Sequence, residues 1–202
     1  MCSEAAKWDE RYRQAKVGVA WEPTSLLKEW LRLLPNGRAL DVACGSGRNA
    51  IYLARNDFEV TGIDWSEAAL EIVAQRAGEV NVPVIRTDAP LTTRNKPGGI
   101  ELILSDLERM ELPERAFGVI VCVQYLQRTL FAQMTRALQC GGVLLFETYT
   151  RAQMKFAGGP RNPAYLLEPG ELRGAFPELR VLFYRELDAG QGIASLVAQK
   201  VS

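Results

Sequence analysis

The chain has 202 residues, of which 48% are hydrophobic and 24% are charged, a composition typical of one soluble globular domain with a complete core. Twenty-four lysine and arginine residues balance 24 aspartate and glutamate residues, so no net positive charge favours a nucleic acid as partner. The chain contains no histidine, which excludes Ser-His-Asp triads, Cys-His pairs and histidine metal sites.

The cysteines and the apolar stretches indicate the cellular setting. The four cysteines (Cys2, Cys44, Cys122 and Cys140) include no C-x-x-C pair, which favours reduced structural thiols over a zinc site or a redox dithiol. No apolar stretch approaches the roughly 18 residues of a membrane span. The first residues also lack the pattern of a signal peptide. We therefore expect a cytoplasmic protein with no membrane partner.

The first half of the chain predicts helices followed by an alternation of strands and helices. Helical spacing covers 4–14 and 23–34, so we expect 1–36 to form a helical cap and 37–202 a core. The next predicted elements are strand 38–42, helix 49–55, strand 59–63 and a helix from the N-cap Ser66 to about Ala77. This alternation favours a parallel sheet covered by helices.

The second half continues the alternation after one exception. Residues 82–87 have the pattern of a strand, but 88–99 is polar and rich in turn residues, so we treat 80–99 as an irregular insert. The remaining predicted elements are strands 100–105, 117–123 and 142–149, helices 130–138 and 168–176, and strands 179–186 and 193–200. The last two strands are separated by a hairpin-length loop. We expect a single α/β domain whose mainly parallel sheet ends in an antiparallel hairpin, with helices on both faces.

A glycine-rich loop follows the first predicted strand. Gly45 and Gly47 lie at a strand-to-helix turn, where backbone N–H groups and close ligand approach are both available. The pattern satisfies G-x-G-x-x-G/A with Ala50 in the last position, so a dinucleotide site is one interpretation. Asp41, at the end of the strand, would repel a pyrophosphate and attract an ammonium or sulfonium group. The charge therefore favours a cationic nucleoside.

Asp64 ends the next predicted strand, 17 residues after Gly47. A carboxylate there can accept hydrogen bonds from both hydroxyls of a ribose, in dinucleotide and S-adenosyl-methionine sites alike. Asp64 therefore indicates a ribose without identifying the cofactor.

Asp41, the glycine loop and Asp64 together resemble the first two motifs of the class I S-adenosyl-methionine-dependent methyltransferases. The segment Ser105-Asp106-Leu107 looks like the adenine clasp of that family, with Asp88 as the rival carboxylate. Residues 121–126 look like the strand beneath the cofactor, and 138–144 resembles L-x-P-G-G with Cys140 in place of proline. Gly118 departs from the family pattern, which usually has an aspartate there.

Four shorter segments are similar to the tellurite-resistance and thiopurine methyltransferase-like group of small-molecule enzymes: 7–12, 124–128, 147–149 and 160–163. The resemblance implies a Rossmann-like sheet of seven strands and in-line, metal-independent transfer of a methyl group from S-adenosyl-methionine to a small molecule. The expected cofactor-binding residues are Asp41, Ala43, Gly45, Gly47, Asp64, Trp65, Asp106, Leu107 and Val123. The substrate-side candidates are Tyr125, Arg128 and Arg161.

Methyl transfer from a sulfonium needs no protein nucleophile, because positioning supplies much of the rate enhancement. Without histidine, the acceptor is expected to be a thiol, chalcogen or amine, or to lose its proton to a carboxylate, Tyr125 or water. Trp8 and Tyr12 lie four residues apart and form either a packing pair or part of a lid. The alternatives are a non-catalytic cofactor-binding protein and a nicotinamide-dependent reductase, which Asp41 and the hairpin disfavour. We expect a monomer or homodimer.

Overall fold

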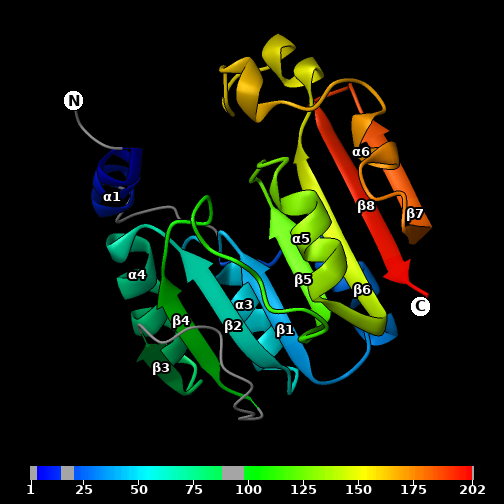
Figure 1. Ribbon diagram of the computed structural model, residues 1–202. Helices are drawn as coiled ribbons and strands as arrows, with labels where there is room; N and C mark the ends of the chain where they lie inside the picture. The colour runs from blue at the N-terminus through cyan, green and yellow to red at the C-terminus, as the bar shows by residue number, and fades with distance from the viewer. Residues whose placement is uncertain (1–3, 15–20, 88–97, 202) are drawn as a thin grey trace.

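The computed structural model describes residues 4–14, 21–87 and 98–201. In this part of the chain, strands of one sheet are covered by helices on both faces (Figure 1). The strands are β1 (Arg38–Val42), β2 (Glu59–Asp64), β3 (Val84–Thr87), β4 (Ile100–Leu104), β5 (Phe117–Val123), β6 (Leu138–Tyr149), β7 (Leu179–Leu187) and β8 (Ile193–Lys200). The α-helices are α1 (Glu4–Gln14), α2 (Ser25–Trp30), α3 (Arg48–Ala54), α4 (Glu67–Glu79), α5 (Leu130–Ala137) and α6 (Glu171–Gly174).

The sheet has the order β3-β4-β2-β1-β5-β6-β8-β7. The pairs from β3 to β6 are parallel, whereas β8 runs antiparallel to both β6 and β7. The expected α/β class, with a mainly parallel sheet and an antiparallel C-terminal hairpin, is confirmed. Every residue of β5 is buried, as expected for a central strand covered on both faces.

The predicted number of seven strands was wrong, because the described sheet has eight. The additional strand is β3, which pairs in parallel with β4 from Val84 opposite Ile100 to Thr87 opposite Ile103. Our interpretation of 80–99 as an irregular insert was therefore wrong for 84–87. This strand has four residues, none of them fully buried, and lies at the sheet edge, so the strand pattern at 82–87 was too short to separate it from the polar segment that follows. Residues 88–97, including Asp88, lie outside the described residues.

The core consists of two clusters, one on each face of the sheet. On one face, Leu26 of α2, Leu53 of α3 and Val73 of α4 pack with residues of the central strands. On the other face, Leu130 of α5 and Leu172 of α6 pack against the same strands. Successive side chains of a strand point to opposite faces of the sheet, so the central strands contribute to both clusters.

Several helices are shorter than their sequence patterns predict. The predicted helix at 23–34 is α2 followed by a 3₁₀ turn, η1 (Leu31–Leu33), and the one at 168–176 is reduced to α6. The N-cap predicted at Ser66 is confirmed, because its Oγ accepts a hydrogen bond from the Ala69 amide at 3.2 Å. No helix of the described ranges is long and apolar enough to cross a membrane.

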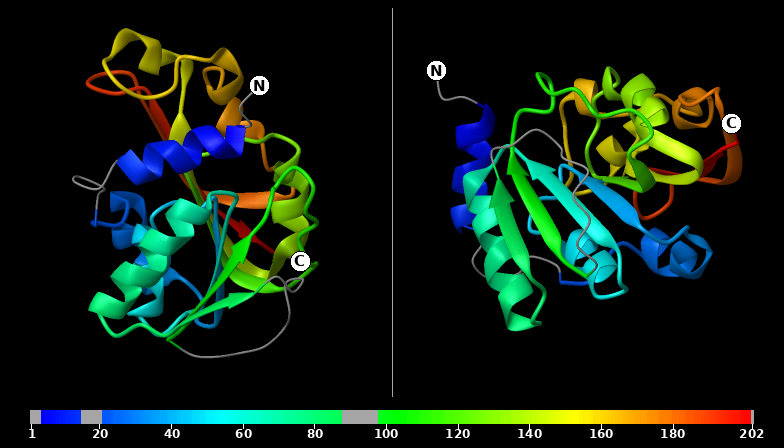
Figure 2. Two further views of the ribbon diagram at one scale, coloured as in Figure 1. Left: turned by 90° about the vertical axis from the view of Figure 1, so that its left-hand side faces the viewer. Right: turned by 60° about the horizontal axis from the view of Figure 1, so that its bottom comes forward.

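The parallel strands end at one edge of the sheet, and this edge carries the site. Since β1, β2, β4 and β5 run in the same direction, the loops after them lie close together (Figure 1). Helix α1 lies beside the start of α4 in both views of Figure 2. The N-terminal helix therefore lies against the segment that follows β2.

Candidate active site

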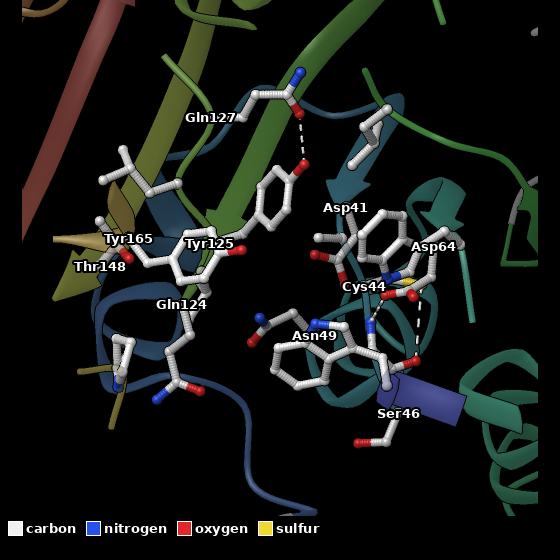
Figure 3. A pocket seen from close by; sticks show the side chains of 18 of the residues that line it. Asp41, Cys44, Ser46, Asn49, Asp64, Gln124, Tyr125, Gln127, Thr148 and Tyr165 are labelled. Carbon is white, nitrogen blue, oxygen red and sulfur yellow. Dashed lines mark hydrogen bonds between the residues drawn. The ribbon is translucent and has the colours of Figure 1, made fainter. Parts of the chain in front are cut away.

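A cavity of about 560 Å³ opens where these parallel strands end. Figure 3 shows two chemically different sides: Asp41, Asn49 and Asp64 lie on one, and Tyr125 and Tyr165 on the other. Its walls come from α1, from the loops that follow β1, β2, β4, β5 and β6, and from Gly159, Pro160 and Tyr165. Of the expected cofactor-binding residues, the cavity is lined by Asp41, Ala43, Gly45, Asp64, Trp65, Leu107 and Val123.

The glycine loop turns sharply between β1 and α3. Ala43, Gly45 and Gly47 all have positive φ angles, of 52°, 54° and 78°. The positive φ of Ala43 is uncommon for a residue with a Cβ and indicates a backbone held in place by its surroundings. The Gly45 amide donates to Asp64 Oδ2 at 2.8 Å, so the loop is fastened to the end of β2.

The two glycines have different neighbours. A Cβ on Gly45 would lie 2.6 Å from the Tyr12 hydroxyl, whereas a Cβ on Gly47 would lie 2.7 Å from both methyl groups of Val73 in α4. Gly47 is not among the residues that line the cavity. Both glycines were expected to permit ligand approach; in the structure, Gly47 permits close packing of the loop on α4.

Asp41 is a buried carboxyl group at the end of β1. Its exposed fraction is 2%, and Oδ2 has no hydrogen-bond partner among the described residues. Burial raises the pKa of Asp41 to about 7, against smaller lowering effects of the Ala50 amide and the Arg48 guanidinium. A buried oxygen without a partner is costly unless a ligand supplies a donor.

Asp64 ends β2 and accepts hydrogen bonds with both oxygens. Oδ2 accepts from the Gly45 amide, and Oδ1 accepts from the Ser66 amide at 2.9 Å. Burial raises the pKa of Asp64, while these hydrogen bonds lower it. The carboxylate is thus held rigidly at the cavity wall.

Helix α1 closes one side of the cavity through Trp8, Arg11 and Tyr12. Asp9 fastens it to the body, because its carboxylate accepts from the Ser66 hydroxyl and from the Ala68 amide at 3.2 Å. The hydrogen bond from Ser66 lowers the pKa of Asp9. Asp64, Ser66 and Asp9 therefore form a continuous chain from the cavity wall to α1.

The loop after β4 brings Ser105, Leu107 and Glu108 to the cavity, but not the side chain of Asp106. Asp106 Oδ1 accepts from the Glu108 amide at 2.9 Å, and Oδ2 lies 3.4 Å from Arg109. The carboxylate expected to hold an adenine thus caps its own turn.

Tyrosine and amide side chains form the other side of the cavity. Tyr125 donates to Gln127 Oε1, and Gln124 Nε2 donates to the Tyr149 hydroxyl at 3.1 Å. Gln124 has a φ of 58°, a second non-glycine residue at the cavity in the left-handed region. Burial raises the pKa of Tyr125 well above its usual value, with smaller contributions from Cys122 and Glu108.

Arg128 and Arg161, expected on the substrate side, do not line the cavity. Arg128 forms an ion pair with Glu171 at 2.6 Å and donates to the carbonyls of Ala164 and Leu166. Arg161 donates to two backbone carbonyls of its own loop. Both guanidinium groups are engaged by the protein itself.

Comparison with known proteins identifies the family. Residues 40–146 match the family described as a methyltransferase domain, and they include the glycine loop, Asp41 and Asp64. The chain belongs to this methyltransferase domain family. The match covers β1 to β6 in part or in full, so it contains most of the residues that line the cavity.

Individual relatives agree with this family. A ubiquinone biosynthesis O-methyltransferase of Alkalilimnicola ehrlichii is 30% identical over 140 residues, which are 67% of this chain and 51% of that protein. The uncharacterized protein UNK4.09 of Schizosaccharomyces pombe is 26% identical over 91% of this chain and 64% of its own length. The chain therefore spans between half and two thirds of these curated relatives.

The fold is shared with solved structures. TehB from Haemophilus influenzae superposes with a TM-score of 0.69 at 17% identity, over 96% of this chain and 67% of that one. At this identity the likeness concerns the fold alone.

Sequence reasoning missed a group of lining residues that share one property: each lies at or next to the end of a strand or the start of a helix. Arg48 and Asn49 begin α3, Gln124 follows β5, and Tyr149 ends β6. Their positions beside predicted strand ends were a usable signal. Tyr165 gave no such signal, because its loop reaches the cavity only through tertiary packing.

Proposed function

We propose that this chain transfers a methyl group from S-adenosyl-methionine to a small-molecule acceptor. The observation that carries the proposal is the buried oxygen of Asp41, which has no partner among the described residues and lies at the glycine loop. A cationic group of the cofactor supplies the missing partner, whereas a pyrophosphate would be repelled. The family match and the methyltransferase names of the relatives support this assignment.

The side of the cavity that carries Asp41 and Asp64 is called the charged half. Its residues fit the parts of the cofactor. Asp41 would hold the ammonium of its methionine portion, with Arg48 as the nearby cation for its carboxylate. Asp64 would accept from the ribose hydroxyls with the lone pairs that the Gly45 and Ser66 amides leave free. Trp65, Leu107 and Val123 offer apolar surface for the adenine, and Ala43, Gly45 and Gly47 shape the loop.

The bound cofactor supplies an activated methyl group on a sulfonium. The chain's own contribution is to position the acceptor and to exclude water, which α1 does by covering the cavity with Trp8 and Tyr12. Tyr125, with its raised pKa, remains protonated at neutral pH and acts as a hydrogen-bond donor, not as a base. This favours acceptors that offer a lone pair without a protein base, such as thiols, chalcogens and amines.

We also propose that the protein works in the cytoplasm, as a monomer or homodimer, on a small molecule and not on a nucleic acid. The balanced charge of the chain and its buried free thiols, Cys44 and Cys122, support this setting.

Transfer of a deuterated methyl group tests the proposal. Wild-type protein would be incubated with S-adenosyl-methionine labelled in its methyl group and with a panel of simple thiols, amines and phenols. We expect labelled product and S-adenosylhomocysteine in equal amounts with at least one class of acceptor. Binding of the cofactor without transfer to any class would favour a non-catalytic binding protein, and binding of a nicotinamide dinucleotide in its place would overturn the cofactor assignment.

A further inference from the structure

The side of the cavity that carries Tyr125 and Tyr165 is called the uncharged half. The segment 149–167 forms its outer wall. Its two ends are joined side by side: the Arg151 amide donates to the Leu167 carbonyl, and the Leu167 amide donates to the Tyr149 carbonyl, each at 2.9 Å. Between them lie two 3₁₀ turns, η2 (Arg151–Lys155) and η3 (Pro163–Tyr165). The segment contributes Tyr149, Gly159, Pro160 and Tyr165 to the cavity lining.

Arg161 fixes the middle of this wall from inside the loop. Its Nη1 donates to the Met154 carbonyl at 2.8 Å, and its Nη2 donates to the Phe156 carbonyl at 2.6 Å. The planar guanidinium thus bridges two carbonyls with two hydrogen bonds, a geometry that the single ammonium of a lysine does not reproduce. Pro160, the neighbouring residue, lines the cavity.

Gln153 holds the same wall against the C-terminal hairpin. This side chain is buried, and its Nε2 donates to the Gly158 carbonyl at 3.2 Å, while its Oε1 accepts from the Gly192 amide at 2.9 Å. A Cβ on Gly159 would lie 2.9 Å from Gln153 Cγ, so the loop packs tightly over this glutamine.

Arg128 holds the far end of the wall from the loop before α5. It donates to the carbonyls of Ala164 at 3.2 Å and Leu166 at 3.0 Å, on either side of Tyr165. Glu171 pairs with the same guanidinium through both carboxylate oxygens. Tyr165, with 47% of its surface exposed, is therefore carried on a fixed backbone.

The wall presents uncharged groups to the cavity. Tyr149, Pro160 and Tyr165 line the cavity from this segment, and Gln124 and Tyr125 line it from the end of β5. Figure 3 shows Tyr165, Gln124 and Tyr125 on the same side of the cavity. Among the described residues, the charged side chains that line the cavity come from α1, the ends of β1 and β2, the start of α3 and the loop after β4: Arg11, Asp41, Asp64, Arg48 and Glu108.

We propose that 149–167 is a preformed wall of the acceptor subsite, that Arg161, Gln153 and Arg128 are its positioning residues, and that it contacts the acceptor through rings and tyrosine hydroxyls without an ion pair. The acceptor is therefore uncharged in the part that meets this wall, because an ion desolvated there would gain no counter-charge from it. This inference rests on the proposed methyl transfer.

Two substitutions of Arg161 separate positioning from direct contact. Arg161→Lys keeps the charge and loses the two-pronged hydrogen bonding, whereas Arg161→Gln loses both. We expect both variants to raise the KM for phenylmethanethiol by about fivefold or more, with a smaller change in kcat and an unchanged Kd for S-adenosylhomocysteine. A wild-type KM for Arg161→Lys together with a raised KM for Arg161→Gln would show that the charge itself binds the acceptor, and would overturn the proposal.

A matched pair of acceptors tests the absence of an ion pair. Phenylmethanethiol and 4-(mercaptomethyl)benzoate share the thiol and the ring, and only the second carries a carboxylate. We expect the protein loaded with S-adenosylhomocysteine to bind the neutral thiol at least about tenfold more tightly. Equal binding, tighter binding of the carboxylate, or no binding of either compound would overturn the proposal.

Hydrogen exchange tests whether Arg161 orders the wall, and this measurement needs no methyl transfer. Backbone amides between 154 and 162 are expected to exchange about tenfold faster in Arg161→Lys and Arg161→Gln than in wild type. Arg180→Gln is the matched control, because Arg180 lies on β7 and donates to Gln199. Unchanged exchange in the Arg161 variants would overturn the role of Arg161 as a positioning residue. Failure of wild type to methylate any acceptor would instead overturn the proposed function, and the exchange result would still stand.

Discussion

The two halves of the cavity differ in how their polar groups are satisfied. In the charged half, the buried carboxylates of Asp41 and Asp64 lie at the ends of adjacent strands, and one oxygen of Asp41 has no partner among the described residues. In the uncharged half, Tyr125 and Gln124 already pair with protein groups. The buried oxygen of Asp41 thus indicates a ligand for the charged half. We expect the uncharged half to select its ligand by shape and by neutral contacts.

The largest expected effect on cofactor binding concerns Asp64. Asp64→Ala removes the acceptor proposed for the ribose and also releases the Gly45 amide, so we expect at least about tenfold weaker binding of S-adenosylhomocysteine. Asp64→Asn should lie between the alanine variant and wild type, because the amide keeps one acceptor. Calorimetry measures the order. Asp188→Ala in the β7–β8 loop is the control, and wild-type affinity in a folded Asp64→Ala protein would remove Asp64 from the site.

Asp41 should have opposite effects on binding and on stability. Because its pKa is raised to about 7, the stability contributed by this carboxyl is present below about pH 4 and is lost as the pH rises through 7. Asp41→Asn avoids this loss, with an upper bound of about 4 kcal/mol at pH 8 from three pKa units. We expect a higher Tm at pH 8 than wild type, a smaller difference at pH 5, and weaker cofactor binding. A lower Tm at pH 8 would show that Asp41 stabilises the free protein.

Substitutions of the two loop glycines should affect different properties, the stability of the protein at Gly47 and its affinity for the cofactor at Gly45. Gly47→Ala brings a methyl group against Val73 and places alanine at a φ of 78°, so we expect a loss of about 1–3 kcal/mol in the free energy of unfolding. Gly45→Ala also places alanine at a positive φ, of 54°, but its methyl group meets the end of the Tyr12 side chain, so we expect a smaller stability loss and mainly weaker cofactor binding. Denaturant unfolding and calorimetry on both variants test this division, and equal stability losses without a difference in affinity would contradict it.

The smallest expected effect concerns the attachment of α1. Asp9→Asn keeps an acceptor but loses its charge, so we expect threefold to tenfold weaker cofactor binding, roughly the difference between a hydrogen bond to a charged group and one to a neutral group. In wild type, exchange of the α1 amides should slow when S-adenosylhomocysteine is added. Identical exchange with and without the compound would argue against α1 as a lid.

The sequence predicted the strand ends better than the side-chain partners. Asp41 and Asp64 line the cavity as expected, because parallel register brings consecutive strand ends together. The strand β3 was left inside the predicted insert, since a short edge strand with little burial gives only a short strand pattern. The contacts of Arg161 and the packing of Gly47 on Val73 depend on tertiary neighbours, which spacing along the chain does not encode.

We expect Asp41 to hold the ammonium group that S-adenosyl-methionine and S-adenosylhomocysteine share. Calorimetric titration of wild type with S-adenosylhomocysteine at pH 6 and pH 8, in buffers of different ionisation enthalpy, measures this contact. Since the pKa of Asp41 is about 7 in the free protein, we expect about tenfold tighter binding at pH 8 and release of a proton at pH 6. Both effects should disappear in Asp41→Asn. Binding that is independent of pH in wild type, or that is as tight in Asp41→Asn, would contradict the account.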